Sequence, residues 1–546
     1  MVRSAPLILR ADADPQIGVG HLVRLMALGA AWRARGGRVL FLGSVASPAI
    51  QQQIRETGAE FVPIGRRHPH PDDLAITFRS IAQMRAEAGT TATVWTAVDG
   101  RHFDADYQTA IRAAGSRLLV VDDLAEAEHY NADLVLNQRP GFDERQYSGC
   151  VGRDTTLLLG TRYALLRPAF TRYRPLRAEV PQVARRLLIA FGGVDPMDLS
   201  SKALAALQRL PIAGLHTRVL VGAANPHTGK LRARARKSGG RIELVDRAEN
   251  WAAEMAWADL AMAPANGACW ELACTQTPAL VTATSPSQVP IARSMAQAGA
   301  MLDLGPARLL NIHRIAAAFN SLCRDAEARS RQIEAARGLV DGAGAARVVA
   351  VMRALDGELA TEDIVLRPLE STDCWPLWRT KPDLSLHTTG LSTDPIPPDE
   401  HRRWFGEKLS TQSARIWVLA LHGLILGVIR YDRADEATAE ISFHVVRSCR
   451  RRGLGTRLIA ETGNWARKTL GVERLRAVVR VGNEASARAF LKTGFQEVAR
   501  RPVRGRECLI FERPALPEEP VAVPALRLFE PEPGAAPQQA DARRLG

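Results

Sequence analysis

The chain has 546 residues, a length that predicts two to four domains rather than one. Hydrophobic residues make up 46% and charged residues 24%, as in ordinary globular proteins, and no apolar run reaches the roughly 20 residues of a membrane helix. The formal net charge is +14, yet no nucleic-acid recognition module accompanies it. With no signal-peptide pattern at the N-terminus, we expect a cytoplasmic protein without a membrane span or nucleic-acid partner.

From residue 1 to about residue 175, short apolar runs alternate with helical patterns, and a second series of this kind fills residues 176–340. Continuous apolar strands between helices predict parallel sheets covered on both faces. Two such halves make a twin Rossmann-like architecture, in which ligands bind at the carboxyl ends of the strands. The expected strands are "PLILRA", "RVLFLGS", "FVPIG", "ATVWTAVDG", "RLLVVDDL" and "ADLVLNQ", then "RRLLIAFGGVD", "TRVLVGAA", "RIELVDRA", "ADLAMAPAN" and "PALVTA".

The first turn of the chain, "DADPQIGVGH", follows a strand at Leu7–Arg10 and leads into a helix at Leu22–Arg35. Gly18 and Gly20 permit backbone N–H groups to approach an anion, such as a diphosphate, at the helix N-terminus. A neutral imidazole at His21 can take a proton from water while that diphosphate is displaced. A simple helix-capping role for His21 is an equal alternative.

The second half of this region contains two similar turns. Gly192 and Gly193 directly follow an apolar strand, and Asn266-Gly267 precedes a helix that carries Glu271 in its first turn. A carboxylate in this position can accept hydrogen bonds from both hydroxyls of a ribose. The alternative for Glu271 is compensation of the helix dipole.

After a connector at residues 341–362, a third domain at 363–513 contains "SCRRRGLGTRLIAETGNWARKTLG". Arg450-x-x-Gly453-x-Gly455 lies between a strand and an amphipathic helix, and its backbone N–H groups suit a pyrophosphate. The alternative is an Arg-rich surface turn. Residues 514–546 are rich in Pro, Glu and Ala, cannot bury a core and are expected to be disordered.

The seven cysteines are scattered and odd in number, so we expect no disulfide framework. Cys269 and Cys274 lack a CxxC partner pair, which favours buried helix cysteines over a metal site. We expect no bound metal.

Five motifs occur in order: "RADADPQIGVGHLVR", "VDDLAEAEHYNADLVLNQ", "LLLGTRYALLRPAF", "FGGVDP" and "WELACTQTP". Together they resemble the UDP-sugar hydrolases of pseudaminic acid synthesis, over residues 7–335. The resemblance implies the GT-B form of the twin Rossmann-like fold and a UDP-linked diacetamido sugar as substrate. It makes His21 the general base and gives Asp12 the role of orienting water or His21. Gly192, Gly193 and Glu271 would belong to the half that binds uridine diphosphate.

Two positions depart from that family. Arg101 stands where an aromatic hydroxyl is usual near the sugar, and Ser287-Gln288 stands where an Asn-Gln pair is usual. Arg101 is then expected to bind the diphosphate, or His102 to fill the space. These positions bear on hydrolase activity and on sugar specificity.

The turn at Arg450–Gly455 and the segment "RAVVRVGNEASARAFLKTGF" resemble motifs A and B of the Gcn5-related N-acetyltransferases (GNAT). The resemblance implies an α+β domain in which Arg450, Arg451, Gly453, Gly455 and Thr456 hold the pyrophosphate of acetyl-CoA. Asn483 and Ser486 would hold its pantetheine or acetyl end. Glu440 is the candidate base for the incoming amine, with an ordinary outward-facing strand carboxylate as the equal alternative. Phe490 replaces the tyrosine that serves many members as general acid.

These resemblances lead to a hypothesis of two consecutive steps on one chain. The C-terminal domain acetylates the amino group of a UDP-linked 4-amino-4,6-dideoxy sugar, and the N-terminal region releases UDP from the product, for flagellin or surface glycan modification. One alternative is a GT-B glycosyltransferase with a separate acetyltransferase domain. The other is a UDP-sugar-binding module that serves the acetyltransferase, impaired at Arg101 and Ser287.

Overall fold

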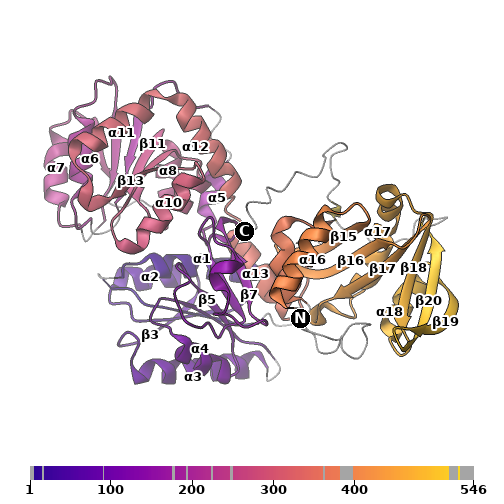
Figure 1. The fold of residues 1–546 in the computed structure, drawn as a ribbon. Coiled ribbons are helices and arrows are strands. Elements are labelled where there is room, and N and C mark those ends of the chain that lie inside the picture. The colour runs from indigo at the N-terminus through magenta and orange to yellow at the C-terminus, as the bar shows by residue number, and fades with distance from the viewer. Residues whose placement is uncertain are drawn as a thin grey trace. The chain divides into compact units, whose positions relative to one another are not determined.

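The chain divides into two compact units, residues 1–349 and 350–546 (Figure 1). The boundary lies within helix α13 (Gly344–Leu355), inside the stretch expected as a connector. The computed structural model describes residues 5–14, 17–89, 92–174, 179–191, 195–222, 225–245, 250–360, 363–380, 397–515 and 527–528.

The first half of unit 1 is a seven-stranded parallel sheet in the order β3-β2-β1-β4-β5-β6-β7. Its strands are β1 (Leu7–Ala11), β2 (Val39–Gly43), β3 (Glu60–Pro63), β4 (Trp95–Asp99), β5 (Arg117–Val121), β6 (Leu134–Asn137) and β7 (Thr156–Leu159). Its helices are α1 (Gly20–Ala34), α2 (Pro48–Glu56), α3 (Pro71–Ala88), α4 (Ala105–Ala113) and α5 (Ala169–Tyr173).

The second half is a six-stranded parallel sheet in the order β10-β9-β8-β11-β12-β13. Its strands are β8 (Arg186–Ile189), β9 (His216–Leu220), β10 (Ile242–Val245), β11 (Leu260–Pro264), β12 (Ala279–Ala283) and β13 (Leu302–Pro306). Its helices are α6 (Leu199–Leu207), α7 (Thr228–Arg236), α8 (Trp251–Trp257), α9 (Ala268–Cys274), α10 (Val289–Gln297), α11 (Ile312–Arg324) and α12 (Ala326–Leu339).

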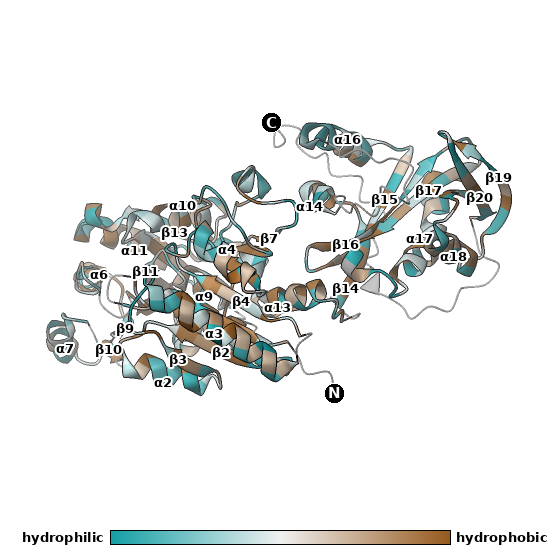
Figure 2. Cartoon of the chain, turned by 90° about the horizontal axis from the view of Figure 1, so that it is seen from below, coloured by the Kyte–Doolittle hydropathy of each residue, from teal (hydrophilic) through white to brown (hydrophobic). Residues whose placement is uncertain are grey.

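The strand order reverses between β1 and β4 in the first sheet and between β8 and β11 in the second. In open parallel sheets, ligands bind beyond the carboxyl ends of the strands at this reversal, because the flanking loops turn to opposite faces there. The turn before α1 and the turn before α9 both follow strands at these reversals. The strands themselves are largely apolar because both of their faces are covered by helices (Figure 2).

Unit 2 contains an eight-stranded mixed sheet in the order β19-β20-β18-β17-β16-β15-β14-β21. Its strands are β14 (Ile364–Pro368), β15 (Ala414–Leu421), β16 (Leu424–Arg433), β17 (Thr438–Val445), β18 (Arg474–Arg480), β19 (Gln496–Val503), β20 (Arg506–Pro514) and β21 (Arg527–Leu528). Its helices are α14 (Cys374–Arg379), α16 (Pro398–Ser410), α17 (Leu454–Leu470) and α18 (Glu484–Lys492). The expected fold class, two Rossmann-like sheets followed by an α+β domain, is confirmed.

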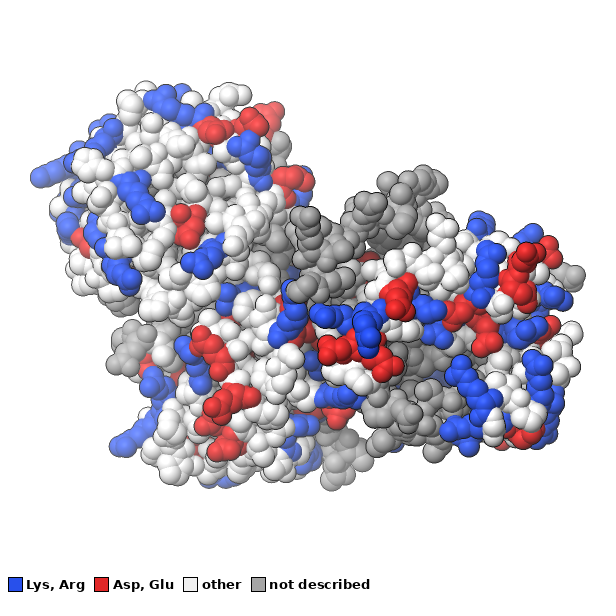
Figure 3. All heavy atoms as spheres, in the orientation of Figure 1, with Lys and Arg blue, Asp and Glu red and all other residues white. Residues whose placement is uncertain are grey.

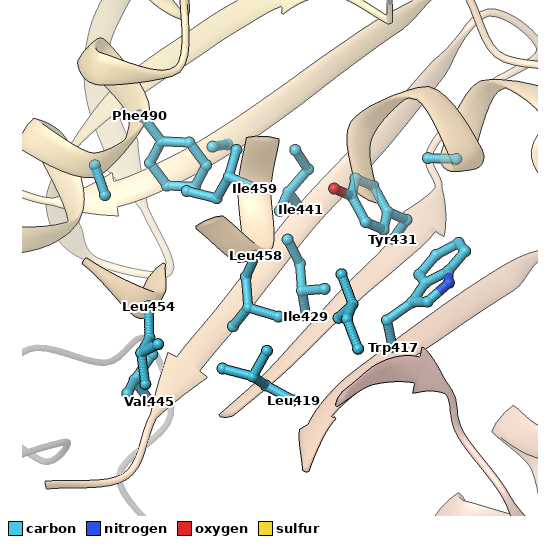
Figure 4. Close-up of a cluster of buried hydrophobic side chains, with 14 of the residues drawn as sticks. Trp417, Leu419, Ile429, Tyr431, Ile441, Val445, Leu454, Leu458, Ile459 and Phe490 are labelled. Carbon is cyan, nitrogen blue, oxygen red and sulfur yellow. The ribbon is translucent and has the colours of Figure 1, made fainter. Parts of the chain in front are cut away.

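The core of unit 2 is formed by one face of this sheet and the apolar faces of α17 and α18, with Trp417, Tyr431, Leu458 and Phe490 among its members (Figure 4). Strand β21 lies within the tail that we expected to be disordered. Arg527 and Leu528 pair in parallel with β14, whose outer edge offers unpaired backbone groups to any extended segment. The other residues of 516–546 lie outside the described part of the chain.

None of the seven cysteines forms a disulfide, as expected. No helix in the described ranges is both long and apolar enough to cross a membrane. On the face shown in Figure 3, Lys and Arg side chains alternate with Asp and Glu rather than gathering into one basic patch.

Candidate functional site

The turn between β1 and α1 leaves the N-terminus of a long helix without a side-chain cap. Gly18 has a φ of +74° and donates from its backbone N–H to Asp14 O at 2.8 Å, which folds the loop back on itself. Val19 is the N-cap residue of α1, and among the described residues no side-chain capping hydrogen bond forms there. The free N–H groups and the helix dipole favour an anion at this point.

His21, in the first turn of α1, contacts a carboxylate instead of capping the helix. Its Nδ1 lies 2.6 Å from Asp99 Oδ1, at the end of β4. Arg24 donates to both Asp99 and Asp123, with 2.7 Å from Nη2 to Asp99 Oδ1 and 2.7 Å from Nη1 to Asp123 Oδ1. Arg24 and His21 hold the pKa of buried Asp99 at about 2, against the opposing effect of burial. Asp99 is therefore ionised and fixes the imidazole, which remains 26% exposed.

Asp12 occupies a second buried network on the same strand edge. Arg10 donates to Asp12 at 2.5 and 3.0 Å and to Asp73 on α3 at 2.6 Å. The Ser44 backbone N–H and His102 Nε2 also contact Asp12, at 2.7 and 3.0 Å. Asp12 therefore contacts His102 rather than His21, and its predicted role in orienting water stays a prediction. Asp99 is the register partner of Ala11, so the two side chains point to the same face of the sheet. Asp12 follows Ala11 and points to the opposite face, so Asp12 and Asp99 contact different histidines.

Arg101 lies at the surface, away from both networks. Its guanidinium is 72% exposed and pairs with Glu126 at 2.5 Å. The diphosphate contact of Arg101 stays a prediction, whereas the neighbouring His102 turns inward toward Asp12. Of the two candidates at this turn, His102 is the one that the fold brings to the strand edge.

In the second half, Glu271 lies in the first turn of α9 as predicted. Burial raises the pKa of its carboxyl group to about 7, and the positive charge of Arg167 opposes the shift. The neighbouring Trp270 Nε1 donates to Gln138 O of the first half at 2.9 Å, which anchors α9 to the loop after β6. A partly buried carboxyl group at a helix start suits a ligand with hydroxyl donors, and the ribose contact stays a prediction.

The remaining predicted residues of this half divide into two groups. Ser287 bonds its neighbour Ser285, at 2.9 Å between hydroxyl oxygens, and Gln288 Oε1 accepts from the Thr284 backbone N–H at 2.9 Å. Both lie in the short turn that leads into α10, and Gln288 shapes it. Gly192 and Gly193, after β8, lie outside the described residues.

In unit 2, strands β17 and β18 separate toward their carboxyl ends. Their parallel register runs from Thr438↔Arg474 to Ile441↔Ala477, and these fully described strands continue to Val445 and Arg480 without further pairs. Two diverging parallel strands expose unpaired N–H and C=O groups on facing edges. An extended ligand can therefore bind between them by backbone hydrogen bonds.

The turn after β17 carries the predicted pyrophosphate motif. Gly453 has a φ of +79° and is the N-cap of α17, and no side chain caps this helix. Gly455 lies so close to Phe443 that a Cβ at this position would be 2.9 Å from the ring. Arg450 Nε donates to Val445 O at 3.0 Å and braces the turn. Arg451, with a φ of +62°, is exposed, and Thr456 lies in the first turn of α17.

The other predicted residues of unit 2 lie on β17 and at or within α18, the helix that follows β18. Asn483 Oδ1 accepts from the Ser486 backbone N–H at 3.3 Å and caps α18, which starts after β18. Phe490 is buried between Phe443 and Phe495, so its position offers no proton donor. Glu440 is exposed and lies where β17 and β18 are still paired, so its role as base stays a prediction.

Sequence reasoning missed three side chains of the first site: Asp99, Arg24 and Asp123. The two aspartates end the apolar strands "TAVDG" and "LLVVDD", a signal that carboxylates meet at one sheet edge. Arg24 lies one turn after His21 on the same helix face. No group of three or more His, Cys, Asp or Glu able to hold a metal ion occurs among the residues that the structure describes.

Comparison with known proteins separates the two units. A family model described as an acetyltransferase (GNAT) domain matches residues 363–496. The spore coat polysaccharide biosynthesis protein SpsG of Bacillus subtilis (strain 168) is 30% identical over 226 residues, which are 41% of this chain and 65% of SpsG. This chain thus spans less than two thirds of that relative.

Among solved structures, MurG of Acinetobacter baumannii is 16% identical with a TM-score of 0.47, over 64% of this chain and 99% of MurG. The spermidine N-acetyltransferase of Vibrio cholerae, in complex with CoA and spermine, is 15% identical with a TM-score of 0.26, over 28% of this chain and 96% of that protein. Residues 363–496 thus match the acetyltransferase (GNAT) domain model, and the twin Rossmann-like unit that precedes them is similar to SpsG.

Proposed function

We propose that the chain is a bifunctional sugar-modifying enzyme of nonulosonic (pseudaminic-type) acid synthesis. The GNAT domain acetylates the 4-amino group of a UDP-linked 4-amino-4,6-dideoxy sugar, and the N-terminal unit releases UDP from the diacetamido product by hydrolysis. The product sugar would serve flagellin or surface glycan modification. The likeness to a polysaccharide biosynthesis protein in one unit and to acetyltransferases in the other supports this pairing.

The observation that carries the hydrolase assignment is the His21–Asp99 contact of 2.6 Å beside the uncapped start of α1. Asp99 fixes Nδ1, which leaves Nε2 to accept a proton from water as the water oxygen attacks the anomeric carbon. The N–H groups at the start of α1 stabilise the negative charge that develops on the leaving diphosphate. Glu271 binds the ribose hydroxyls.

For the acetyl transfer, the turn from Arg450 to Thr456 would hold the pyrophosphate of acetyl-CoA on backbone N–H groups. The fit rests on Gly453 and Gly455, since a side chain at Gly455 would strike Phe443 and one at Gly453 would strain the turn. Acetyl-CoA supplies an activated thioester when bound. Asn483 and Ser486 would hold its pantetheine or acetyl end, and Glu440 would take the proton of the attacking amine. Water or another side chain would protonate the thiolate, because Phe490 has no hydroxyl.

The test is to incubate the intact protein with the UDP-linked diacetamido sugar, with and without candidate sugar acceptors, and to measure free sugar and UDP. Free sugar in the absence of an acceptor supports hydrolysis. Acceptor-dependent UDP release identifies a glycosyltransferase instead, and tight binding without turnover identifies a binding module. His313→Asn, an exposed histidine on α11, is the matched control for His21 variants.

A further inference from the structure

The carboxyl edge of the first sheet contains two networks of the same composition. In each, one arginine is held between two aspartates: Arg10 between Asp12 and Asp73, and Arg24 between Asp99 and Asp123. Two carboxylates and one guanidinium leave a formal charge of −1 in each network. The side chains of the Arg10 network are at most 1% exposed, so its uncompensated charge favours a positively charged partner beside it, whereas Asp123 of the Arg24 network is 29% exposed to solvent.

Each network has a histidine in that place. His21 contacts Asp99 at 2.6 Å, and His102 contacts Asp12 at 3.0 Å. The two imidazoles are exposed to a similar extent, 26% and 21%, so both remain accessible to a ligand. Since Ala11 is the register partner of Asp99, the two carboxylates leave the paired strands β1 and β4 at neighbouring positions but toward opposite faces. Both border the place where the strand order reverses, so a ligand bound beyond the carboxyl ends of β1 and β4 can reach both histidines.

The position of His102 depends on Gly100. Gly100 has a φ of +152°, and a Cβ there would be 2.6 Å from His102 Cε1 and 3.0 Å from Nδ1. The ring therefore lies directly on the backbone that follows Asp99. With Nε2 on Asp12, the Nδ1 side of His102 faces the end of β4 that also carries the partner of His21.

The groups around His102 favour this histidine as the residue that carries a proton in its network. Asp12, which directly follows β1, contacts His102, and Arg10 and Asp73 complete this network. Asp104, the N-cap of α4, and Tyr107 interact with the neighbouring His68. His68 is close, with 6.3 Å between the ring centroids, but burial lowers its pKa and favours the neutral form. Only His102 of these two histidines is bonded directly to a carboxylate within 3.0 Å.

We propose that His102, held by Asp12 and Gly100, is a second proton-transfer residue of this site and acts as the acid that complements His21. This inference rests on the proposed hydrolysis of a UDP-sugar. Water forms a bond from its oxygen to the anomeric carbon, His21 accepts the water proton, and the bond between that carbon and the phosphate oxygen breaks. The electron pair stays on the phosphate oxygen, which receives the Nδ1 proton of His102, and solvent then restores both histidines.

The experiment measures kcat/KM for UDP release against pH in the intact chain. A base and an acid together produce a bell-shaped profile. His102→Asn is expected to lower the maximum roughly 10²-fold and to remove the fall at high pH, while the rise at low pH, set by His21, remains. Gly100→Ala, which displaces the ring but keeps every titrating group, is expected to lower the maximum in the same direction. His313→Asn is expected to leave the profile unchanged.

A structural role would give a different result. If His102→Asn lowers the melting temperature and retains both limbs of the profile, or retains full activity, the inference is wrong. Calorimetry with UDP separates this failure from failure of the proposed function. If the wild-type chain binds UDP without hydrolysing the sugar nucleotide, the proposed hydrolysis is wrong. In that case the inference about His102 requires that UDP binding takes up a proton and that His102→Asn abolishes this uptake. Equal proton uptake in both proteins overturns it, and absence of UDP binding overturns both proposals.

Discussion

The two glycine-containing turns of this chain, before α1 and before α17, share a position at the end of a strand but differ in what surrounds them. The turn before α1 is bordered by side-chain networks that hold His21 and His102, whereas Gly18 and Gly20 have open space around them. The turn before α17 packs Gly455 against Phe443 and is braced by Arg450 through a backbone carbonyl. The first turn is built to present ionisable side chains, and the second to present backbone N–H groups.

The largest expected effect tests the side-chain chemistry of the first turn. His21→Asn should lower the rate of UDP release by about 10²–10⁴ and leave UDP binding nearly intact, because the general base is lost while backbone groups still hold the diphosphate. Steady-state kinetics and calorimetry with UDP measure the two effects. Near-normal turnover would mean that His21 serves only the structure of α1.

The carboxyl group of Glu271 provides a pH-dependent test of the same unit. Its folded pKa of about 7 lies above the ordinary value of 4.5, so the folded protein binds the extra proton and the free energy of unfolding falls as pH rises between these values. Glu271→Gln should therefore stabilise the unit at pH 8, by up to about 3 kcal/mol, and have little effect at pH 4. Thermal unfolding at the two pH values measures this. Glu334→Gln, an exposed carboxyl on α12, is the control, and equal shifts in both variants would contradict the assignment.

The second turn is tested at Gly455. Gly455→Val should raise the KM for acetyl-CoA at least about tenfold without changing UDP release, because the new side chain displaces Phe443 and deforms the backbone that would hold the pyrophosphate. Gly406→Ala, at a helical glycine of α16 with open space around it, controls for the substitution itself. Unchanged acetyl-CoA kinetics in Gly455→Val would remove the motif assignment.

The smallest effect concerns the boundary between the units. A fragment that ends near Asp356 should bind UDP, and one that starts near Glu362 should bind acetyl-CoA, since no motif crosses the boundary. Ala354 belongs to the core of unit 2 and Leu359 packs against it, so a fragment of residues 344–546 should be more stable than 362–546 by about 1–2 kcal/mol. Chemical denaturation of the two fragments measures the difference. Inactive fragments beside an active whole chain would show that the units depend on each other.

Local patterns in the sequence determined the strands, the glycine turns and the placement of His21, Glu271 and Gly453 at helix starts. These features depend on residues within a few positions of each other, and apolar strand runs and glycine-rich turns are visible at that range. The separation of the chain into an N-terminal α/β region and a C-terminal α+β domain followed from the same patterns.

Only the tertiary structure decided which carboxylate meets which histidine. Asp99 lies 78 residues from His21, and Asp12 lies 90 residues from His102, so strand order and side-chain alternation bring them together. The same contacts place Asp12 beside His102 rather than His21 and leave Arg101 at the surface. Burial and neighbouring charge, which set the pKa of Asp99 and Glu271, also depend on distant residues, because a desolvated group responds to everything packed around it.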